Sequence, residues 1–181
     1  MVDALTLKEG KEKKFMKLGQ AQMDEKICFV LMNENGKISK VLFPGQVPED
    51  ITLKRDKKAD EIAEKVVQWI THGETFFHSF RVTGTSFQQR VYTATQKIPK
   101  GKVTTYKVVA EKIGTKAYRA VGQALGANPV PLLVPCHRVV GSDRRLTGFG
   151  AGIELKRKIL EAEGVGFEGE KVKKEYILQE I

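Results

Sequence analysis

A proline-rich track, GANPVPLLVPCHRVV at positions 126–140, constrains the local fold more than any other feature of this sequence. It contains three of the six prolines of the chain: Pro129, Pro131 and Pro135. Proline fixes φ, removes a backbone donor and restricts the residue before it. We therefore expect a stiff extended segment here and not a helix. Such stiffness is useful where one side chain must stay in place, and the track contains Cys136 beside His137.

The part of the chain that precedes this track predicts a small α+β unit. Two β-rich runs between positions 26 and 43 flank Asn35-Gly36, a dipeptide suited to a tight hairpin turn. A helix is expected from Lys58 to His72, with an apolar face and a stop at Gly73. Its apolar face contains Ile62, Val66, Trp69 and Ile70. A boundary near Gly84 gives an N-terminal domain over 1–84 and a C-terminal domain over 85–181.

The second domain is predicted to be mainly helical. A capping-box pattern at Ser86 opens its first helix, and Thr104 or Thr105 caps the second. A third helix follows after a short connection at Thr115-Lys116. Two short helices joined by a tight turn are typical of a helix-turn-helix. A last helix is expected from about Ile153 to Glu163.

The positive charge of the chain is confined to this second part. The formal net charge is +9 at pH 7, and the isoelectric point is about 9.5. Between Thr85 and Gly150 there are eleven basic and two acidic residues, whereas the rest contains twenty of each. A polyanion such as DNA is the natural partner of such a segment. A solvated lysine-rich surface is the alternative, and the complete segregation of charge makes it the weaker one.

Composition excludes several other classes of protein. No apolar run approaches the roughly 20 residues of a membrane-spanning helix, and the charged N-terminus does not resemble a secretory signal. We therefore expect a cytoplasmic protein with no membrane association. Cys28 lies in an apolar β-like run and is interpreted as a small buried hydrophobe, with no disulfide to Cys136. Without a CxxC motif or paired histidines, no metal site is expected.

Cys136 and His137 are a candidate nucleophile and base. A free cysteine has a pKa near ~8.5 and is mostly protonated at neutral pH. A neighbouring imidazole can accept that proton, directly or through a water, and a cation such as Arg138 favours the thiolate. A carboxylate behind the imidazole would orient it. The residues alone offer Glu161 and Glu163 for that position without choosing between them.

The segment from Arg119 to Gly164 resembles the signature of the O6-alkylguanine-DNA alkyltransferases. The resemblance rests on the core PCHRV, the flanking RAVG, the asparagine of GANP and the EG ending. It implies direct-reversal DNA repair, in which a methyl or other alkyl group moves irreversibly and stoichiometrically to the protein's own Cys136. The donor would be O6-alkylguanine, and more weakly O4-alkylthymine, flipped out of duplex DNA. The N-terminal unit would be a ribonuclease-H-like antiparallel sheet with a helix.

The resemblance also implies a role for each catalytic residue. Cys136 would be the alkyl acceptor and His137 a water-mediated base. Glu163 would orient the imidazole, which settles the choice against Glu161. Asn128 would brace the turn before the active-site track, and Tyr106 would donate a proton towards the guanine leaving group.

Contacts to DNA and to the damaged base are implied in the same way. Arg119 would enter the base stack in place of the extruded nucleotide, with the recognition helix in the minor groove. The implied DNA contacts are Thr105, Tyr106, Arg119, Ala120, Gln123 and Arg138. The implied pocket residues are Tyr106, Pro131, Val139, Phe149, Gly150 and Lys156. Many family members carry tyrosine and serine where this chain has Phe149-Gly150, so backbone amides of the 147–151 loop are expected to replace the missing hydroxyls. We expect a monomer without cofactor or zinc.

Two other functions fit parts of the pattern. A non-catalytic DNA-binding relative would share the basic helices, but such relatives replace the acceptor cysteine, which is present here. A Cys-His-Glu hydrolase would use the same three side chains with turnover, but it would not need a basic domain.

Overall fold

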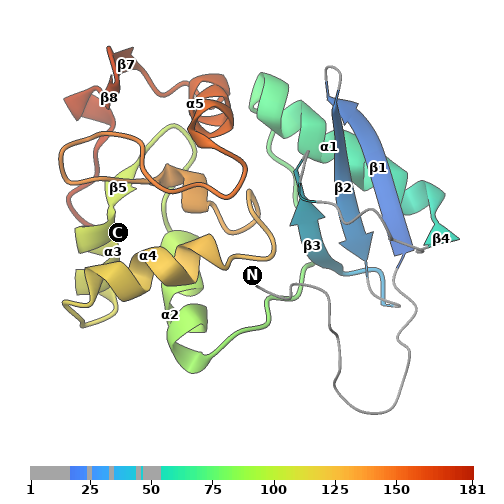
Figure 1. Ribbon diagram of the computed structural model, residues 1–181, viewed down its shortest axis with the longest axis horizontal. Coiled ribbons are helices and arrows are strands. Elements are labelled where there is room, and N and C mark those ends of the chain that lie inside the picture. Colours follow the sequence, from blue (N-terminus) through green and yellow to red (C-terminus); the bar gives the residue numbers. More distant parts are fainter. Residues whose placement is uncertain (1–16, 24–25, 33–34, 44–45, 47–53) are drawn as a thin grey trace.

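The computed structural model describes residues 17–23, 26–32, 35–43, 46 and 54–181, which form two bodies side by side (Figure 1). One body contains a sheet and helix α1, and the other contains helices α2 to α5. The predictions for the N-terminus and for the side chain of Cys28 lie outside the described residues. No helix in the described part of the chain is long and apolar enough to cross a membrane.

The N-terminal sheet has the strand order β3-β2-β1-β4. Its strands are β1 (Lys17–Met23), β2 (Lys26–Met32), β3 (Ile38–Leu42) and β4 (Lys54–Arg55). The β1–β2 and β2–β3 pairs are antiparallel, and Gly36 has the positive φ of 68° that the predicted β2–β3 turn requires. The expectation of an antiparallel sheet is incomplete, because β4 crosses to the far edge and pairs parallel with β1.

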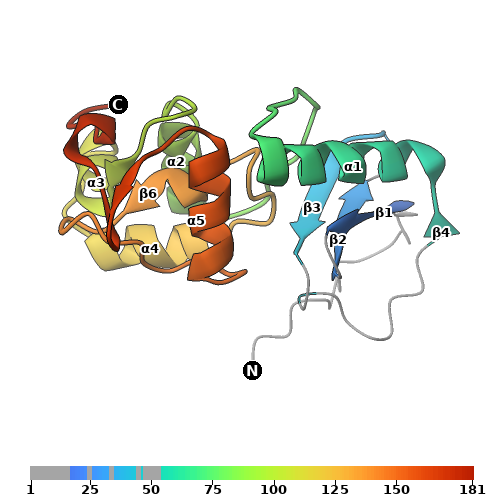
Figure 2. The same cartoon turned by 90° about the horizontal axis from the view of Figure 1, so that it is seen from above.

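Helix α1 (Lys57–His72) packs across one face of this sheet (Figure 2). Asp56 caps its start by accepting a hydrogen bond from the Ala59 amide. Gly73 ends it in the left-handed conformation at φ 69° and donates its amide to the Trp69 carbonyl. Gly19 of β1 lies so close to α1 that a β-carbon there would stand 1.9 Å from the Ala59 carbonyl oxygen. The backbones therefore meet directly, which fixes α1 on the sheet.

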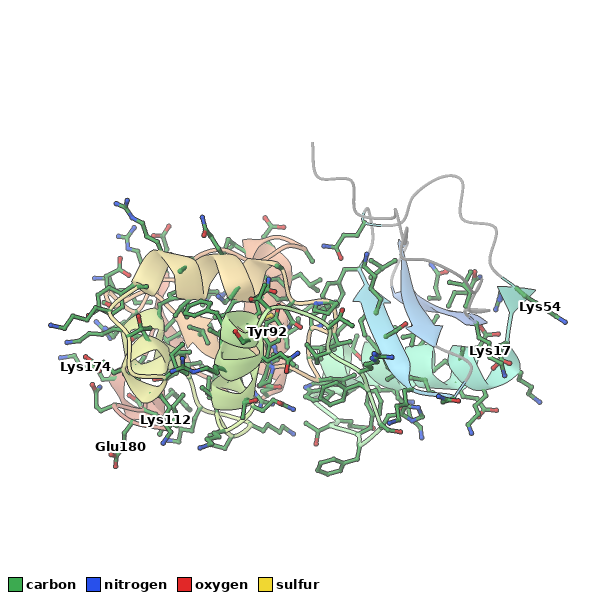
Figure 3. All side chains as sticks on the ribbon, turned by 90° about the horizontal axis from the view of Figure 1, so that it is seen from below. Lys17, Lys54, Tyr92, Lys112, Lys174 and Glu180 are labelled. Atoms are coloured by element: carbon green, nitrogen blue, oxygen red, sulfur yellow. The ribbon has the colours of Figure 1, made fainter. Side chains whose placement is uncertain are left out.

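Four helices build the C-terminal body. They are α2 (Ser86–Thr95), α3 (Tyr106–Lys112), α4 (Tyr118–Gly126) and α5 (Ile153–Ala162). The capping box of α2 uses Thr85 and Gln88, one residue earlier than the sequence predicts. The buried Tyr92 hydroxyl donates to the Ala124 carbonyl at 3.0 Å and so joins α2 to α4 (Figure 3).

Two pairs of short strands occur in this body, and only the β5–β6 pair joins segments that are distant in sequence. The pairs are β5 (Thr104–Thr105) with β6 (Val139–Val140), which is parallel, and β7 (Phe167–Glu168) with β8 (Lys171–Val172), which is antiparallel. Through the β5–β6 pair, the start of α3 lies beside the end of the proline-rich track.

The proline-rich track is not the extended segment that its prolines predict. The Val134 amide donates to the Val130 carbonyl at 3.0 Å, which closes a tight turn. Leu132 within that turn has a φ of 73°, a conformation that costs energy for a residue with a branched side chain. Residues Cys136–Arg138 then form a short 3-10 helix. The track is stiff because it is folded tightly, and its cysteine lies at the start of that 3-10 helix.

The two bodies share a hydrophobic core. One buried cluster contains residues of the sheet and of α1 together with Val130, Leu132 and Val134 of the track and Ile159 of α5. The C-terminal end of α1 lies beside α5 in both views (Figures 1 and 2). The domain boundary at residue 84 stays a prediction, and this buried cluster contains residues from both sides of it.

Candidate active site

Cys136 is a buried thiol at the start of the 3-10 helix. Its Sγ accepts a hydrogen bond from Asn128 Nδ2 at 3.3 Å. Burial raises the pKa of this thiol, and the Asn128 amide and the Lys156 charge only partly oppose that shift. The proton therefore remains on sulfur at neutral pH, and reaction requires a base to remove it.

His137 follows Cys136 in the 3-10 helix and is fully buried. Its Nε2 is 3.1 Å from Glu163 Oε1, whereas its Nδ1 has no hydrogen-bond partner among the described residues. Burial lowers the pKa of the imidazole, against the opposing effect of Glu163, so the ring is neutral near pH 7. Because Glu163 is ionised, we infer that Nε2 carries the proton. Nδ1 is then an acceptor, as a base requires.

Glu163 is the carboxylate that meets His137, and Glu161 does not. Burial would raise the pKa of Glu163, but hydrogen bonds from His137 and Arg138 hold it well below its usual range. Glu161 instead lies at the surface and pairs with Arg157 at 2.8 Å. Glu163 follows the last residue of α5, where the chain turns and directs its side chain inwards.

The position of Arg138 differs from the one predicted. It was expected to contact DNA and to favour the thiolate, but it is buried and its guanidinium forms a bidentate pair with Glu163, at 2.7 and 2.8 Å. A third nitrogen donates to the Ile98 carbonyl at 2.8 Å. A charge buried at this depth is stable only when paired, and Glu163 is the partner. The cation near the sulfur is Lys156.

Asn128 organises the track through three hydrogen bonds. Its Nδ2 donates to the Val134 carbonyl at 2.9 Å as well as to Cys136 Sγ, and its Oδ1 accepts from the Val130 amide at 3.1 Å. The side chain thus satisfies backbone groups that a regular element would have paired. The predicted bracing position agrees with this geometry.

Lys156 and Tyr106 converge on one carbonyl. The buried Lys156 Nζ donates to the carbonyls of Val139 and Thr147, at 2.6 and 2.8 Å. The Tyr106 hydroxyl donates to the same Thr147 carbonyl at 3.2 Å. Burial lowers the pKa of Lys156 to about 8 and raises that of Tyr106. Together the two side chains fasten the 147–151 loop beside Cys136.

The other predicted pocket residues lie around this loop. Pro131 and Val139 are buried. Phe149 is half-buried and its ring centre is 5.7 Å from that of Phe43, which belongs to the N-terminal body. A β-carbon on Gly150 would stand 3.2 Å from Gln46 Nε2. The N-terminal body therefore supports the outer side of the loop.

The predicted DNA contacts other than Arg138 and Tyr106 gather on α4 and at the start of α3. Arg119 and Gln123 are exposed on α4, with Ala120 half-buried between them. The guanidinium of Arg119 forms no ion pair with the described residues. Thr105 caps α3 by accepting from the Val108 amide at 3.3 Å, which occupies its hydroxyl oxygen.

One residue of the site is absent from the sequence-based predictions. Trp69 Nε1 donates to Glu163 Oε1 at 2.7 Å, although Trp69 was interpreted only as a core residue of α1. A buried indole needs an acceptor for its N–H, and the apolar face of α1 offers none, which is the signal that could have revealed it.

Known proteins resemble this chain in both sequence and fold. Residues 86–165 match the family described as 6-O-methylguanine DNA methyltransferase, DNA binding domain. The crystal structure of Mycobacterium tuberculosis OGT in complex with DNA superposes with a TM-score of 0.71 and 33% identity, over 81% of this chain and 92% of that one. This chain belongs to the O6-methylguanine DNA methyltransferase family. The archaeal family member from Pyrococcus kodakaraensis has a TM-score of 0.63 and 27% identity, over 83% of this chain and 99% of its own.

Similarity in sequence to curated family members covers a little less than half of this chain. The methylated-DNA–protein-cysteine methyltransferase of Haemophilus influenzae is 47% identical over 85 residues, 46% of this chain and 48% of its own length. That of Metallosphaera sedula is 52% identical over 84 residues, 46% and 53% of the two chains. The chain thus aligns with about half the length of these relatives.

Proposed function

We propose that this protein transfers a methyl or larger alkyl group from the O6 atom of guanine in double-stranded DNA to Sγ of its own Cys136. The observation that carries the proposal is the buried pair of His137 and Glu163, with His137 next to Cys136 in the 3-10 helix. His137 Nε2 lies 3.1 Å from Glu163 Oε1. His137 Nδ1 has no hydrogen-bond partner among the described residues, so it can accept the proton of the adjacent residue Cys136. The names of the relatives support the same reaction.

The reaction begins with a neutral thiol and a neutral imidazole. His137 Nδ1 takes the Cys136 proton through a water, and Glu163 stabilises the imidazolium that forms. The thiolate attacks the alkyl carbon, a carbon–sulfur bond forms and the carbon–O6 bond breaks. The electron pair of that bond stays on guanine. None of the described residues around Cys136 could cleave the thioether product, so each molecule would react once.

The guanine anion requires a proton donor. Tyr106 is suited to this, because burial keeps its hydroxyl protonated and that hydroxyl reaches the 147–151 loop at the Thr147 carbonyl. The Tyr106 hydroxyl donates a hydrogen bond to the Thr147 carbonyl. During the reaction it would leave that carbonyl and donate to the flipped guanine instead. Lys156 stays on the same carbonyl and keeps the loop fixed during the exchange.

The base must leave the duplex before it can reach a buried thiol, at a cost of a few kcal/mol. Basic residues of the C-terminal body offset that cost through phosphate contacts, and the exposed Arg119 enters the space left in the stack. We propose that α4 lies in the minor groove of the DNA, with Thr105, Ala120 and Gln123 near the sugar-phosphate backbone. The protein would act as a monomer, and O4-alkylthymine would be a weaker substrate.

We further propose that residues 1–84 form a ribonuclease-H-like support domain and residues 85–181 a helix-turn-helix domain that carries the reaction. The order β3-β2-β1-β4, with β4 parallel to β1, supports the first assignment. The short link between α3 and α4 supports the second.

The proposal is tested with duplex DNA that carries a labelled methyl group on guanine O6. We expect one methyl per protein molecule, found by mass spectrometry on the peptide containing Cys136, and none in Cys136→Ala. Repeated turnover would favour a hydrolase, and tight binding without transfer would favour a non-catalytic lesion-binding protein. Label on Cys28 or another residue would also overturn the proposal.

A further inference from the structure

Trp69 links the N-terminal body directly to the Cys136 site. Its indole nitrogen donates to Glu163 Oε1 at 2.7 Å, across 94 residues of sequence, and both side chains are buried. It is the only tryptophan of the chain. None of the roles described above for transfer uses this residue.

The end of α1 is built to approach Glu163. Gly73 closes α1 one turn after Trp69, and a β-carbon there would stand 2.1 Å from the Ala162 carbonyl oxygen and 3.3 Å from the Glu163 amide nitrogen. Its φ of 69° also disfavours any other residue. The backbone of α1 therefore meets the end of α5 at the residues that direct the Glu163 carboxylate.

The indole itself is fixed on several sides. Its ring makes an edge contact with Phe76, at 5.9 Å between centres, and the Arg138 guanidinium lies 6.0 Å from its ring centre. Oε1 of Glu163 accepts from Trp69, Arg138 and His137, whereas Oε2 accepts from Arg138 alone among the described residues. The indole thus restricts the oxygen that His137 uses.

We propose that Trp69 is a positioning residue for alkyl transfer, through which the N-terminal body holds the Glu163 carboxylate against His137. This rests on the proposed function, because its consequence is read in the transfer reaction. The N–H also places the positive end of a dipole near the imidazole. Its removal therefore favours the imidazolium and raises the pKa of His137.

The experiment compares Trp69→Phe with Val66→Ala. The first variant keeps an aromatic ring and removes the N–H, whereas the second removes buried packing from the same helix without touching Glu163. Single-turnover transfer from O6-methylguanine DNA is measured between pH 5 and 9. We expect Trp69→Phe to be slower by roughly tenfold, with the acid limb of its profile moved to higher pH. Val66→Ala should keep the wild-type midpoint.

Two further measurements keep the inference testable if Trp69→Phe folds poorly. Replacement of tryptophan by its benzothiophene analogue, which lacks the N–H but keeps the ring shape, alters only this site. In the intact protein, the single indole N–H signal in a nitrogen-15 NMR spectrum should lie downfield, resist exchange and shift in Glu163→Gln.

The outcomes separate the two proposals. The transfer rates and pH midpoints could be equal in the wild type, the benzothiophene protein and Trp69→Phe. Trp69 would then be a core residue without a positioning role. A fast-exchanging indole signal that ignores Glu163→Gln would overturn the contact itself. Failure of the wild type to transfer methyl would refute the proposed function, whereas the NMR result would still report the contact.

Discussion

Cys136 and His137 are both kept neutral by burial, and this decides how the site works. A thiol with a raised pKa and an imidazole with a lowered pKa do not form an ion pair at rest. In the proposed reaction, the proton would move only once the alkyl carbon is in place to accept electrons from sulfur. Lys156, whose pKa is lowered by burial to about 8, carries a charge that acts on Cys136 and would stabilise the thiolate as it forms.

Glu163→Gln should disturb both stability and transfer. The change leaves Arg138 buried without its charge partner, which costs about 3–5 kcal/mol. We expect that loss in urea unfolding at pH 7, together with much slower methyl transfer. Glu161→Gln, two residues earlier on the surface, is the matched control and should leave both measurements almost unchanged.

The loss of stability in Glu163→Gln should depend on pH in a definite direction. The pKa of Glu163 is lower in the folded than in the unfolded protein, so its stabilisation is complete above the unfolded value of about 4.3. It is lost as pH falls towards the folded value. The stability gap between wild type and Glu163→Gln should therefore narrow below about pH 4. A gap that is constant from pH 7 to pH 3 would contradict the assignment.

At the level of elements, helix α4, the tight turn of the track and the end of α1 together position the reactive groups. The Asn128 side chain links the end of α4 to the turn and to the Cys136 sulfur, so the position of the thiol is coupled to the helix that carries Arg119. The end of α1 fixes Glu163 from the other side. The reactive groups thus sit where three elements meet.

Arg119→Ala should separate base extrusion from chemistry. Without the guanidinium, the flipped state in duplex DNA loses a contact, and we expect transfer from duplex O6-methylguanine to slow by roughly tenfold. Reaction with free O6-benzylguanine needs no extrusion and should be nearly unchanged. Arg81→Ala removes an equally exposed arginine from the N-terminal body and serves as the control. Equal loss on both substrates would contradict the role of Arg119.

At the level of the whole molecule, charge and core are distributed differently. The excess of basic residues lies between Thr85 and Gly150, but the hydrophobic core extends from the sheet into the track and α5. In the proposed function, the C-terminal body would contact DNA, and the N-terminal body would stabilise the C-terminal body through the shared core. Lys112 and Lys174 lie at the outer surface of the C-terminal body (Figure 3).

The affinity for DNA should depend steeply on salt. Phosphate contacts release counterions, so the logarithm of the binding constant should fall linearly with the logarithm of salt concentration. Lys116→Gln, in the link between α3 and α4, should make that slope shallower by about one. Lys65→Gln, on the exposed side of α1, should not alter the slope. A salt-independent affinity would contradict binding through the basic segment.

Much of the fold was predictable because local rules govern its parts. The Asn35-Gly36 turn, the bounds of α1 and the two helices that follow Thr105 all depend on neighbouring residues. The proline-rich track was predicted wrongly, since proline rules describe each residue and not the hydrogen bonds that Asn128 supplies from outside the turn. The parallel β4 was also missed, because pairing at a far sheet edge leaves no local pattern.

The sequence by itself determined the candidate pair of Cys136 and His137, the choice of Glu163 through family spacing, and the confinement of basic charge to one segment. These are properties of residue type and order, which a sequence states directly. Only the tertiary structure decided that Arg138 turns inwards to Glu163 and that Trp69 completes the same site. Both depend on which buried polar groups meet after folding, and the need to pair a buried charge is satisfied by whichever donors the packing brings close.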